Sequence, residues 1–322
     1  MKEKNMSDTN ISDAVRKGYG AVATAGLSSD HDNIKGIAKA FGYSEEELAS
    51  IPAESNMGLS CGNPVAMASI RAGETVVDLG AGGGLDVFLA SKAVGPTGRA
   101  IGIDITGDMV SLARKNAARG GYENVKFYLA EIEAMPIPDN SVDCVISNCV
   151  LNLCADKDVA LKEIFRILKP GGRLAISDIA LRKTLPAEIE KEVAAWTGCI
   201  AGAMTIEVNR EKLSAAGFSE IDIVDSNSDL NAYRDGGHAA CCGPETAGDM
   251  SADADAGCCA PEAKAAESES GCCPPTTEDS AKSAPKSDVD VASEYHQTMG
   301  ALLDTFDVNE FAASVKIFAL KP

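Results

Sequence analysis

The sequence contains no long uninterrupted hydrophobic stretch. No run reaches the roughly 18 apolar residues that a membrane-spanning helix requires. The first ten residues, MKEKNMSDTN, carry lysines but no apolar segment behind them, which argues against a secretory signal. We therefore expect a soluble, cytoplasmic protein.

Basic residues are scarce relative to acidic ones. The 322 residues include 29 Lys and Arg against 48 Asp and Glu, so the formal net charge is −19. Such a chain repels phosphate backbones and anionic lipids, which argues against nucleic acid and membranes as partners. Histidine is also rare. His31, His238 and His296 have no spacing typical of a metal site, and we expect each to be a solvated surface residue.

Cysteine, in contrast, is abundant, with 11 residues. Because the cytosol keeps thiols reduced, so many of them suggest the binding of soft ions. Five are dispersed through the part of the chain with a globular composition: Cys61, Cys144, Cys149, Cys154 and Cys199. The other six form three adjacent pairs, at 241/242, 258/259 and 272/273.

The most informative stretch is VVDLGAGGGLD at residues 76–86. An apolar run, four glycines and an apolar helical pattern follow one another, which predicts a strand, a tight turn and the start of a helix. Glycine permits positive φ and close approach of a ligand, and the first turn of the helix offers unpaired N–H groups. The stretch therefore predicts a site for a nucleoside-bearing cofactor.

The residues around the glycines discriminate between cofactors. A dinucleotide enzyme normally has an apolar residue where Asp78 stands, and it must also cradle a pyrophosphate. The next expected strand, AIGIDIT, ends in Asp104, which is well placed to accept hydrogen bonds from ribose hydroxyls. The pattern E/D-x-G-x-G-x-G followed by an acidic strand end resembles the class I methyltransferases that use S-adenosylmethionine. We favour that cofactor over a dinucleotide.

From residue 74 onward, expected strands alternate with expected helices. The strands are predicted at 75–79, 100–105, 124–130, 142–148 and 173–179. Such alternation predicts an α/β fold, a Rossmann-like parallel sheet with helices on both faces and ligands beyond the carboxyl ends of the strands. The sequence KPGG is expected to end a helix and turn the chain into the fifth strand.

Composition divides the chain into five segments. They are an N-terminal helical segment (1–60), the cofactor-binding core (61–181), a helical insert with a sixth strand (182–234), an acidic insertion with the cysteine pairs (235–290), and a terminal helix with a last strand (291–322). The insertion has too few large apolar side chains to offset chain entropy, so we expect it to be disordered. Class I sheets end in an antiparallel hairpin of strands six and seven, so the insertion is expected inside that hairpin.

The resemblance to class I methyltransferases implies roles for individual residues. The three glycines Gly80, Gly82 and Gly84 should face the methionine and ribose of the cofactor. Asp78 should lie near the methionine amino group, and Asp104 should hold the ribose.

Four further residues complete the implied cofactor site. Met109 should pack on the adenine, and Glu131 with Ile132 resembles the adenine-side pair of the family. Asn148 ends the fourth strand, where such enzymes present backbone groups to the reacting centre. For Met109 and Ile132, ordinary packing is an equally weighted interpretation.

Cys149 directly follows Asn148, beside the expected position of the sulfonium methyl group. Cys61 and Cys199 lie in glycine-flanked segments outside the sheet that could fold over the same edge, where three thiols would bind a thiophilic ion. The alternative is that each cysteine is a small buried hydrophobe, which fits Cys144 and Cys154.

The cysteine-bearing segments resemble a known family. GLSCGNPVAMASI, SNCVLNL and GCIAGA, together with the cofactor motifs between them, are similar in order and spacing to the arsenite methyltransferases over roughly residues 56–225. The resemblance implies that Cys61, Cys149 and Cys199 bind arsenic(III) and take part in thiol redox chemistry. It further implies that the arsenic lone pair attacks the sulfonium methyl, and that thioredoxin or glutathione reduces the resulting disulfide.

One feature departs from this family. Its members commonly carry cysteine after the N-terminal Tyr-Gly, where this chain reads YGAVATAGLSSDHDN. The methylation endpoint therefore stays open, and the cysteine pairs are either capturing or resolving thiols or a tolerated insertion. We expect a monomer. Two alternatives to arsenite methylation are a methyltransferase for a small organic acceptor and a soft-metal scavenger acting through the cysteine pairs.

Overall fold

The structure of the protein is a computed structural model that describes residues 6–184, 200, 202–232 and 307–322. The expected disorder at 235–290, the helix expected near 293–306 and most of the helical insert lie outside the described residues.

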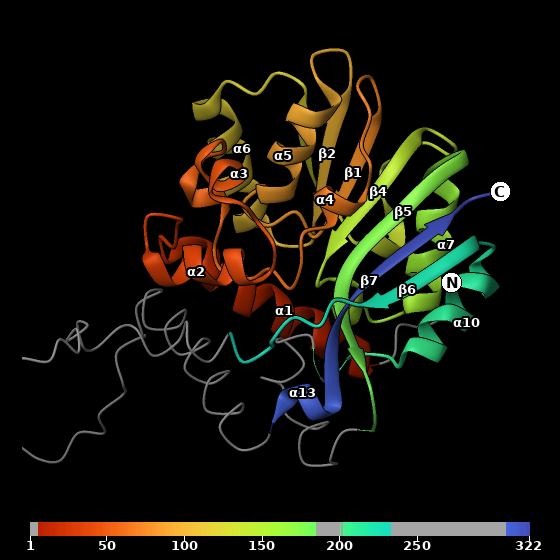
Figure 1. Ribbon diagram of the computed structural model, residues 1–322. Helices are drawn as coiled ribbons and strands as arrows, with labels where there is room; N and C mark the ends of the chain where they lie inside the picture. The colour runs from red at the N-terminus through yellow and green to blue at the C-terminus, as the bar shows by residue number, and fades with distance from the viewer. Residues whose placement is uncertain (1–5, 185–199, 201, 233–306) are drawn as a thin grey trace, which may run out of the picture.

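A seven-stranded sheet forms the centre of the protein (Figure 1). The strands are β1 (Thr75–Leu79), β2 (Arg99–Asp104), β3 (Val125–Leu129), β4 (Val142–Asn148), β5 (Leu168–Leu181), β6 (Ser219–Asp225) and β7 (Ala312–Leu320). Their order is β3-β2-β1-β4-β5-β7-β6, with parallel pairing from β3 to β5 and antiparallel pairing of β7 with both of its neighbours. This confirms the predicted Rossmann-like α/β sheet.

Helices cover both faces of the sheet (Figure 1). The described helices are α1 (Met6–Thr24), α2 (Asp32–Ala40), α3 (Glu45–Ala49), α4 (Pro64–Met67), α5 (Leu85–Val94), α6 (Gly107–Gly120), α7 (Lys157–Ile167), α10 (Ile206–Ala216) and α13 (Val308–Phe311), with short 3-10 turns η1 (Ala53–Ser55), η2 (Ile132–Ala134) and η3 (Leu151–Leu153). Successive strand residues point to opposite faces. Val76 accordingly packs with Phe88 of α5, whereas Val77 packs in the cluster that contains Ile164 of α7 and Leu213 of α10.

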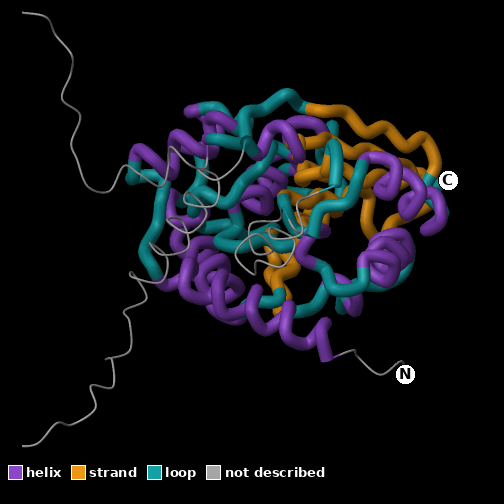
Figure 2. The backbone as a smooth tube through the Cα atoms, turned by 90° about the horizontal axis from the view of Figure 1, so that it is seen from below, coloured by secondary structure: helices purple, strands orange, loops and turns teal. Residues whose placement is uncertain are grey.

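Helix α1 passes below the sheet in Figure 1, whereas α2 and α3 lie to one side of it. Seen from below, α1 follows the margin of the molecule and the strands lie toward the C-terminus (Figure 2).

The predicted capping box at the start of α3 is present: the Glu47 N–H donates to Ser44 Oγ, and the Ser44 N–H donates to the Glu47 carboxylate. This reciprocal pair satisfies N–H groups that the helix cannot bond internally.

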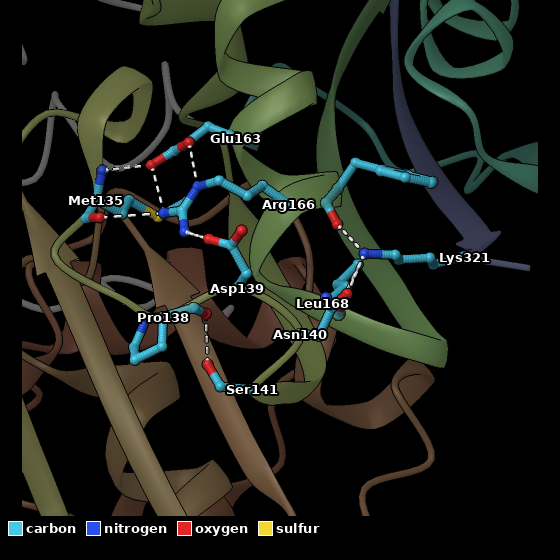
Figure 3. Close-up of polar contacts among 10 residues, drawn as sticks. Met135, Pro138, Asp139, Asn140, Ser141, Glu163, Arg166, Leu168 and Lys321 are labelled. Carbon is cyan, nitrogen blue, oxygen red and sulfur yellow. Dashed lines mark hydrogen bonds and ion pairs between the residues drawn. The ribbon is translucent and has the colours of Figure 1, made fainter.

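The last strand returns to the core as predicted, between β5 and β6. Lys321, just beyond β7, donates from Nζ to Asn140 Oδ1 at 2.7 Å and to the carbonyls of Phe165 and Leu168 at 2.8 Å (Figure 3). In the same view Arg166 bridges Glu163 and Asp139. The Lys321 bonds fasten the end of β7 to the end of α7, and the Arg166 bonds fasten α7 to the loop before β4.

One boundary differs from the prediction. The KPGG segment does not lie outside the sheet, because β5 already begins at Leu168. The Gly171 N–H donates to the Lys321 carbonyl, and the Lys321 N–H donates to the Gly172 carbonyl, so partners far along the chain extend the strand.

Within the part of the chain that the structure describes, no helix combines the length and the hydropathy of a membrane span.

Candidate functional site

A cavity of about 450 Å³ opens at the carboxyl ends of the parallel strands. It is lined by seven of the nine residues predicted to bind a cofactor: Gly80, Gly82, Asp104, Met109, Glu131, Ile132 and Asn148. Asp78 and Gly84 do not line it. The structure thus brings together residues from four separate strand ends.

Two glycines at the start of the cavity adopt conformations that other residues rarely take. Gly80 has a φ of +68°, and a Cβ added to it would overlap the Val150 side chain. Gly82 has a φ of +50°, and its N–H donates to Asp104 Oδ2 at 2.9 Å. Gly84 instead opens α5 at a φ of +100° against Phe88, so its role here is in packing.

The carboxylate of Asp104 is held in place by backbone groups. Its Oδ1 accepts from the Thr106 N–H at 2.8 Å, while its Oδ2 accepts from Gly82. Burial raises the pKa of Asp104, and these hydrogen bonds partly counter the rise. Asp104 also lines the cavity, and a carboxylate is an acceptor for the hydroxyls of a ligand.

Three carboxyl groups gather behind this cavity. Burial raises the pKa of Asp78 well above its ordinary value, and repulsion from Asp86 and Asp104 adds to the rise. Asp86 accepts from Tyr43 Oη at 2.8 Å and from Asn148 Nδ2 at 3.2 Å. A cationic ligand would relieve the repulsion among these carboxyl groups, whereas a pyrophosphate would add to it.

Neutralising Asp86 is expected to change how stability depends on pH. Burial raises the pKa of Asp86, so above the ordinary carboxyl pKa of about 4 the folded state binds more protons than the unfolded state. The free energy of unfolding therefore falls as the pH rises through this window. Relative to Asp86→Asn, the free energy of unfolding of the wild type should fall by about 2 kcal/mol between pH 5 and pH 8, as measured by urea titration. Asp108→Asn, at an exposed position, is the control, and an equal difference at both pH values would contradict the assignment.

Two cysteines meet at the edge of the cavity. Cys61 and Cys149 are paired as a disulfide with their Cα atoms 6.0 Å apart, and Cys149 also lines the cavity. Cys149 has a φ of +57°, a left-handed conformation that is uncommon for a side-chain-bearing residue. Its N–H donates to the Ser177 carbonyl at 2.8 Å, which ties it to the neighbouring strand.

Cys61 reaches this position through two anchors. Its N–H donates to Asn148 Oδ1 at 3.0 Å, and its carbonyl accepts from Ser314 Oγ of β7 at 2.7 Å. Asn148 also donates to the Gly62 carbonyl and to Tyr43 Oη. The Asn148 side chain therefore holds the Cys61 segment against the end of β4.

The remaining cysteines divide into two groups. Cys144 and Cys154 are buried free thiols; burial raises the pKa of Cys144 to about 12 and raises that of Cys154 as well. The packing interpretation fits Cys144, inside β4, whereas Cys154 also lines the cavity. Cys199 and the pairs at 241/242, 258/259 and 272/273 lie outside the described residues.

Some lining residues were not anticipated from the sequence. Ser12, Val15 and Tyr19 of α1 also face the cavity, and Arg16 of the same helix donates to Glu131 Oε1 at 3.0 Å. The available signal was the helical pattern of ISDAVRKGYG, which indicated a helix but not its place.

The strand order, the glycine turn after β1 and the acidic residue that ends β2 together define a class I methyltransferase fold. Residues 70–234 match the family described as "Methyltransferase domain". The chain belongs to this family.

Individual relatives extend the comparison. An arsenite methyltransferase from Halobacterium salinarum is 40% identical over 243 residues, which cover 69% of this chain and 62% of that protein. A ubiquinone/menaquinone biosynthesis C-methyltransferase from Hahella chejuensis is 40% identical over 112 residues, 34% of this chain and 45% of its own length. The phosphoethanolamine N-methyltransferase 2 of Haemonchus contortus has a similar structure, with a TM-score of 0.56 at 15% identity, over 90% of this chain and 57% of that one. This last likeness concerns the fold alone.

Proposed function

We propose that this protein transfers methyl groups from S-adenosylmethionine to thiol-bound trivalent arsenic, converting arsenite to methylarsenicals for detoxification. The observation that carries the proposal is the Cys61–Cys149 pair at the rim of the cofactor cavity. The 40% identity to an arsenite methyltransferase, over 62% of its length, adds support.

The cavity residues fit S-adenosylmethionine. The cofactor supplies an electrophilic methyl group on a sulfonium centre, and it carries an ammonium group that suits the buried carboxylates around Asp78. Gly80 permits the positive φ of the turn and the close contact with Val150 at the cavity wall. Asp104 accepts from the ribose hydroxyls, while Met109, Glu131 and Ile132 form the adenine side. Gly82 and Asn148 shape the turn and the strand end on either side of the reacting centre.

The arsenic site consists of Cys61, Cys149 and Cys199. Soft thiolates select a soft centre such as arsenic(III). Ile200, which follows Cys199 in the chain, is buried in the same apolar cluster as Cys61 and Cys149, and this neighbourhood supports the inclusion of Cys199.

The thiolates position arsenic so that its lone pair points at the methyl group, and such positioning supplies most of the rate. Methyl transfer would form an As–C bond and break the S–CH₃ bond of the sulfonium, release S-adenosylhomocysteine, and oxidise arsenic from the trivalent to the pentavalent state. Two cysteine thiols return the two electrons and become a disulfide, the pairing that Cys61 and Cys149 have in the structure. Thioredoxin or glutathione then reduces that disulfide.

Several broader features belong to the same proposal. The protein acts as a cytoplasmic monomer without nucleic acid or membrane partners. Its segments are those expected from composition: 1–60, 61–181, 182–234, 235–290 and 291–322.

A second candidate is methylation of a small organic acceptor. The similarity to a ubiquinone/menaquinone biosynthesis C-methyltransferase favours it, although that similarity covers only 34% of the chain. Under this alternative the thiols at Cys149 and Cys199 would be dispensable. A scavenger acting through the cysteine pairs would instead lose metal binding when residues 235–290 are deleted.

The deciding experiment incubates the reduced protein with S-adenosylmethionine, arsenite and a thiol reductant, and separates arsenic species by chromatography with elemental detection. Methylated arsenic is the expected product. Its absence from protein that still binds S-adenosylmethionine would contradict the proposal and favour the organic acceptor.

A further inference from the structure

A carboxyl group faces the two sulfur atoms from the adjacent strand. Asp178 lies in β5, which pairs with β4 through Asn148 and Ser177. The sulfur atoms of Cys61 and Cys149 and a carboxylate oxygen of Asp178 all lie within 4.8 Å of one another. The Asp178 side chain is only 3% exposed, so the three groups form a compact set shielded from water.

The two oxygens of Asp178 have different surroundings. Oδ1 accepts from Asn152 Nδ2 and from the Ile179 N–H, both at 2.8 Å. Oδ2 is fully buried and has no hydrogen-bond partner in the described part of the chain. A buried acceptor without a donor costs folding free energy, so each such group in a folded protein needs an explanation, such as a bound ion or a functional role. The side chain is therefore fixed in orientation through one oxygen and unsatisfied at the other.

Trivalent arsenic bound at the two sulfur atoms would bring a hydrogen-bond donor close to the Asp178 carboxylate. Arsenous acid, As(OH)₃, exchanges two hydroxyls for two thiols, releases two water molecules and stays trivalent as (RS)₂As–OH. The third hydroxyl keeps its proton. A hydroxyl on arsenic bound to Cys61 and Cys149 would lie next to the Asp178 carboxylate.

We propose that Asp178 is a positioning residue of the arsenic site, whose carboxylate accepts a hydrogen bond from the hydroxyl of arsenic held by Cys61 and Cys149. The inference rests on the proposed function and refines it: capture of arsenite begins as a complex of two thiolates and one carboxylate. A third thiol, from Cys199, then displaces the hydroxyl as water.

This role makes Asp178 selective among arsenicals. Phenylarsine oxide reacts with two thiols, releases one water molecule and retains no hydroxyl. It needs the cysteines but has nothing to donate to Asp178. The carboxylate should therefore strengthen the binding of arsenite without strengthening the binding of phenylarsine oxide.

The test compares both arsenicals on full-length Cys199→Ser protein, in which the third arsenic substituent remains a hydroxyl. Asp178→Asn retains an oxygen for Asn152 and Ile179 but removes the free carboxylate oxygen. Binding is read as protection of Cys61 and Cys149 from alkylation, quantified peptide by peptide so that thiols of the 235–290 segment do not interfere. We expect the arsenite dissociation constant to rise about tenfold or more and that of phenylarsine oxide to change less than about twofold.

Asp143→Asn, at the opposite end of the sheet, controls for the loss of a carboxylate and should leave both constants unchanged. Equal weakening for both arsenicals would assign Asp178 a merely structural role and overturn the inference, as would an unchanged arsenite constant. If the parent protein binds phenylarsine oxide but fails to bind arsenite at these thiols, the proposed function fails and the inference fails with it.

Discussion

Replacing Cys149 with serine is expected to lower methylarsenical formation by at least about 100-fold. A hydroxyl is a poor ligand for a thiophilic centre, and no disulfide with Cys61 can form to complete the redox step. The substitution changes one atom, and Ser69 of this chain adopts a similar φ of +47°, beside the +57° of Cys149. The measurement is the initial rate of arsenic methylation, with calorimetry of S-adenosylmethionine binding on the same preparation.

Cys144→Ala is the control, because Cys144 is a buried free thiol of β4, the strand that directly precedes Cys149, and lies outside the cavity lining. It should lose little activity, and both variants should bind S-adenosylmethionine within about threefold of the wild type. A Cys149→Ser protein that methylates arsenite at more than a tenth of the wild-type rate would remove Cys149 from the site.

Replacing Asp104 with alanine is expected to weaken S-adenosylmethionine binding by about 100-fold. Hydrogen bonds to charged groups contribute about 1.5–3 kcal/mol each, and the ribose is expected to lose its acceptor. The same change leaves the N–H groups of Gly82 and Thr106 without their acceptor, so the glycine turn also loses its anchor. Isothermal titration calorimetry with S-adenosylhomocysteine measures the constant without turnover.

Two variants separate these contributions. Asp104→Asn keeps one oxygen for a backbone N–H and should retain part of the affinity. Asp108→Ala removes an exposed acid in the first turn of α6 and should bind the ligand normally. If Asp104→Ala binds as tightly as Asp108→Ala, the ribose lies elsewhere and the placement of the cofactor in this cavity is wrong.

The parts of the fold that the sequence predicted best are those whose information is local. The bounds of β1 and β4 match the predicted 75–79 and 142–148, because each strand is an apolar run enclosed by residues that interrupt it. The capping box of α3 is likewise complete within four residues. Seven of the nine residues predicted to bind the cofactor line one cavity, because the strand ends of a parallel sheet share one edge.

Contacts between distant segments were not predictable in the same way. Tyr43, Asp86 and Asn148 form one network, yet nothing near any of them in the chain indicates the other two. In the sequence alone, nothing distinguishes Asp178 from other strand residues. Only the β4–β5 register shows that it lies beside Cys149. The extension of β5 into KPGG also depends on Lys321, more than a hundred residues away.

The strand order has a consequence for synthesis of the protein on the ribosome. The only strand that β6 pairs with in the described sheet is β7, yet residues 226–311 are translated between them. At about 5–20 residues per second, β6 waits on the order of ten seconds for its partner. Throughout that interval β5 presents a free backbone edge, so the nascent chain is most vulnerable to misassociation just before its final strand emerges.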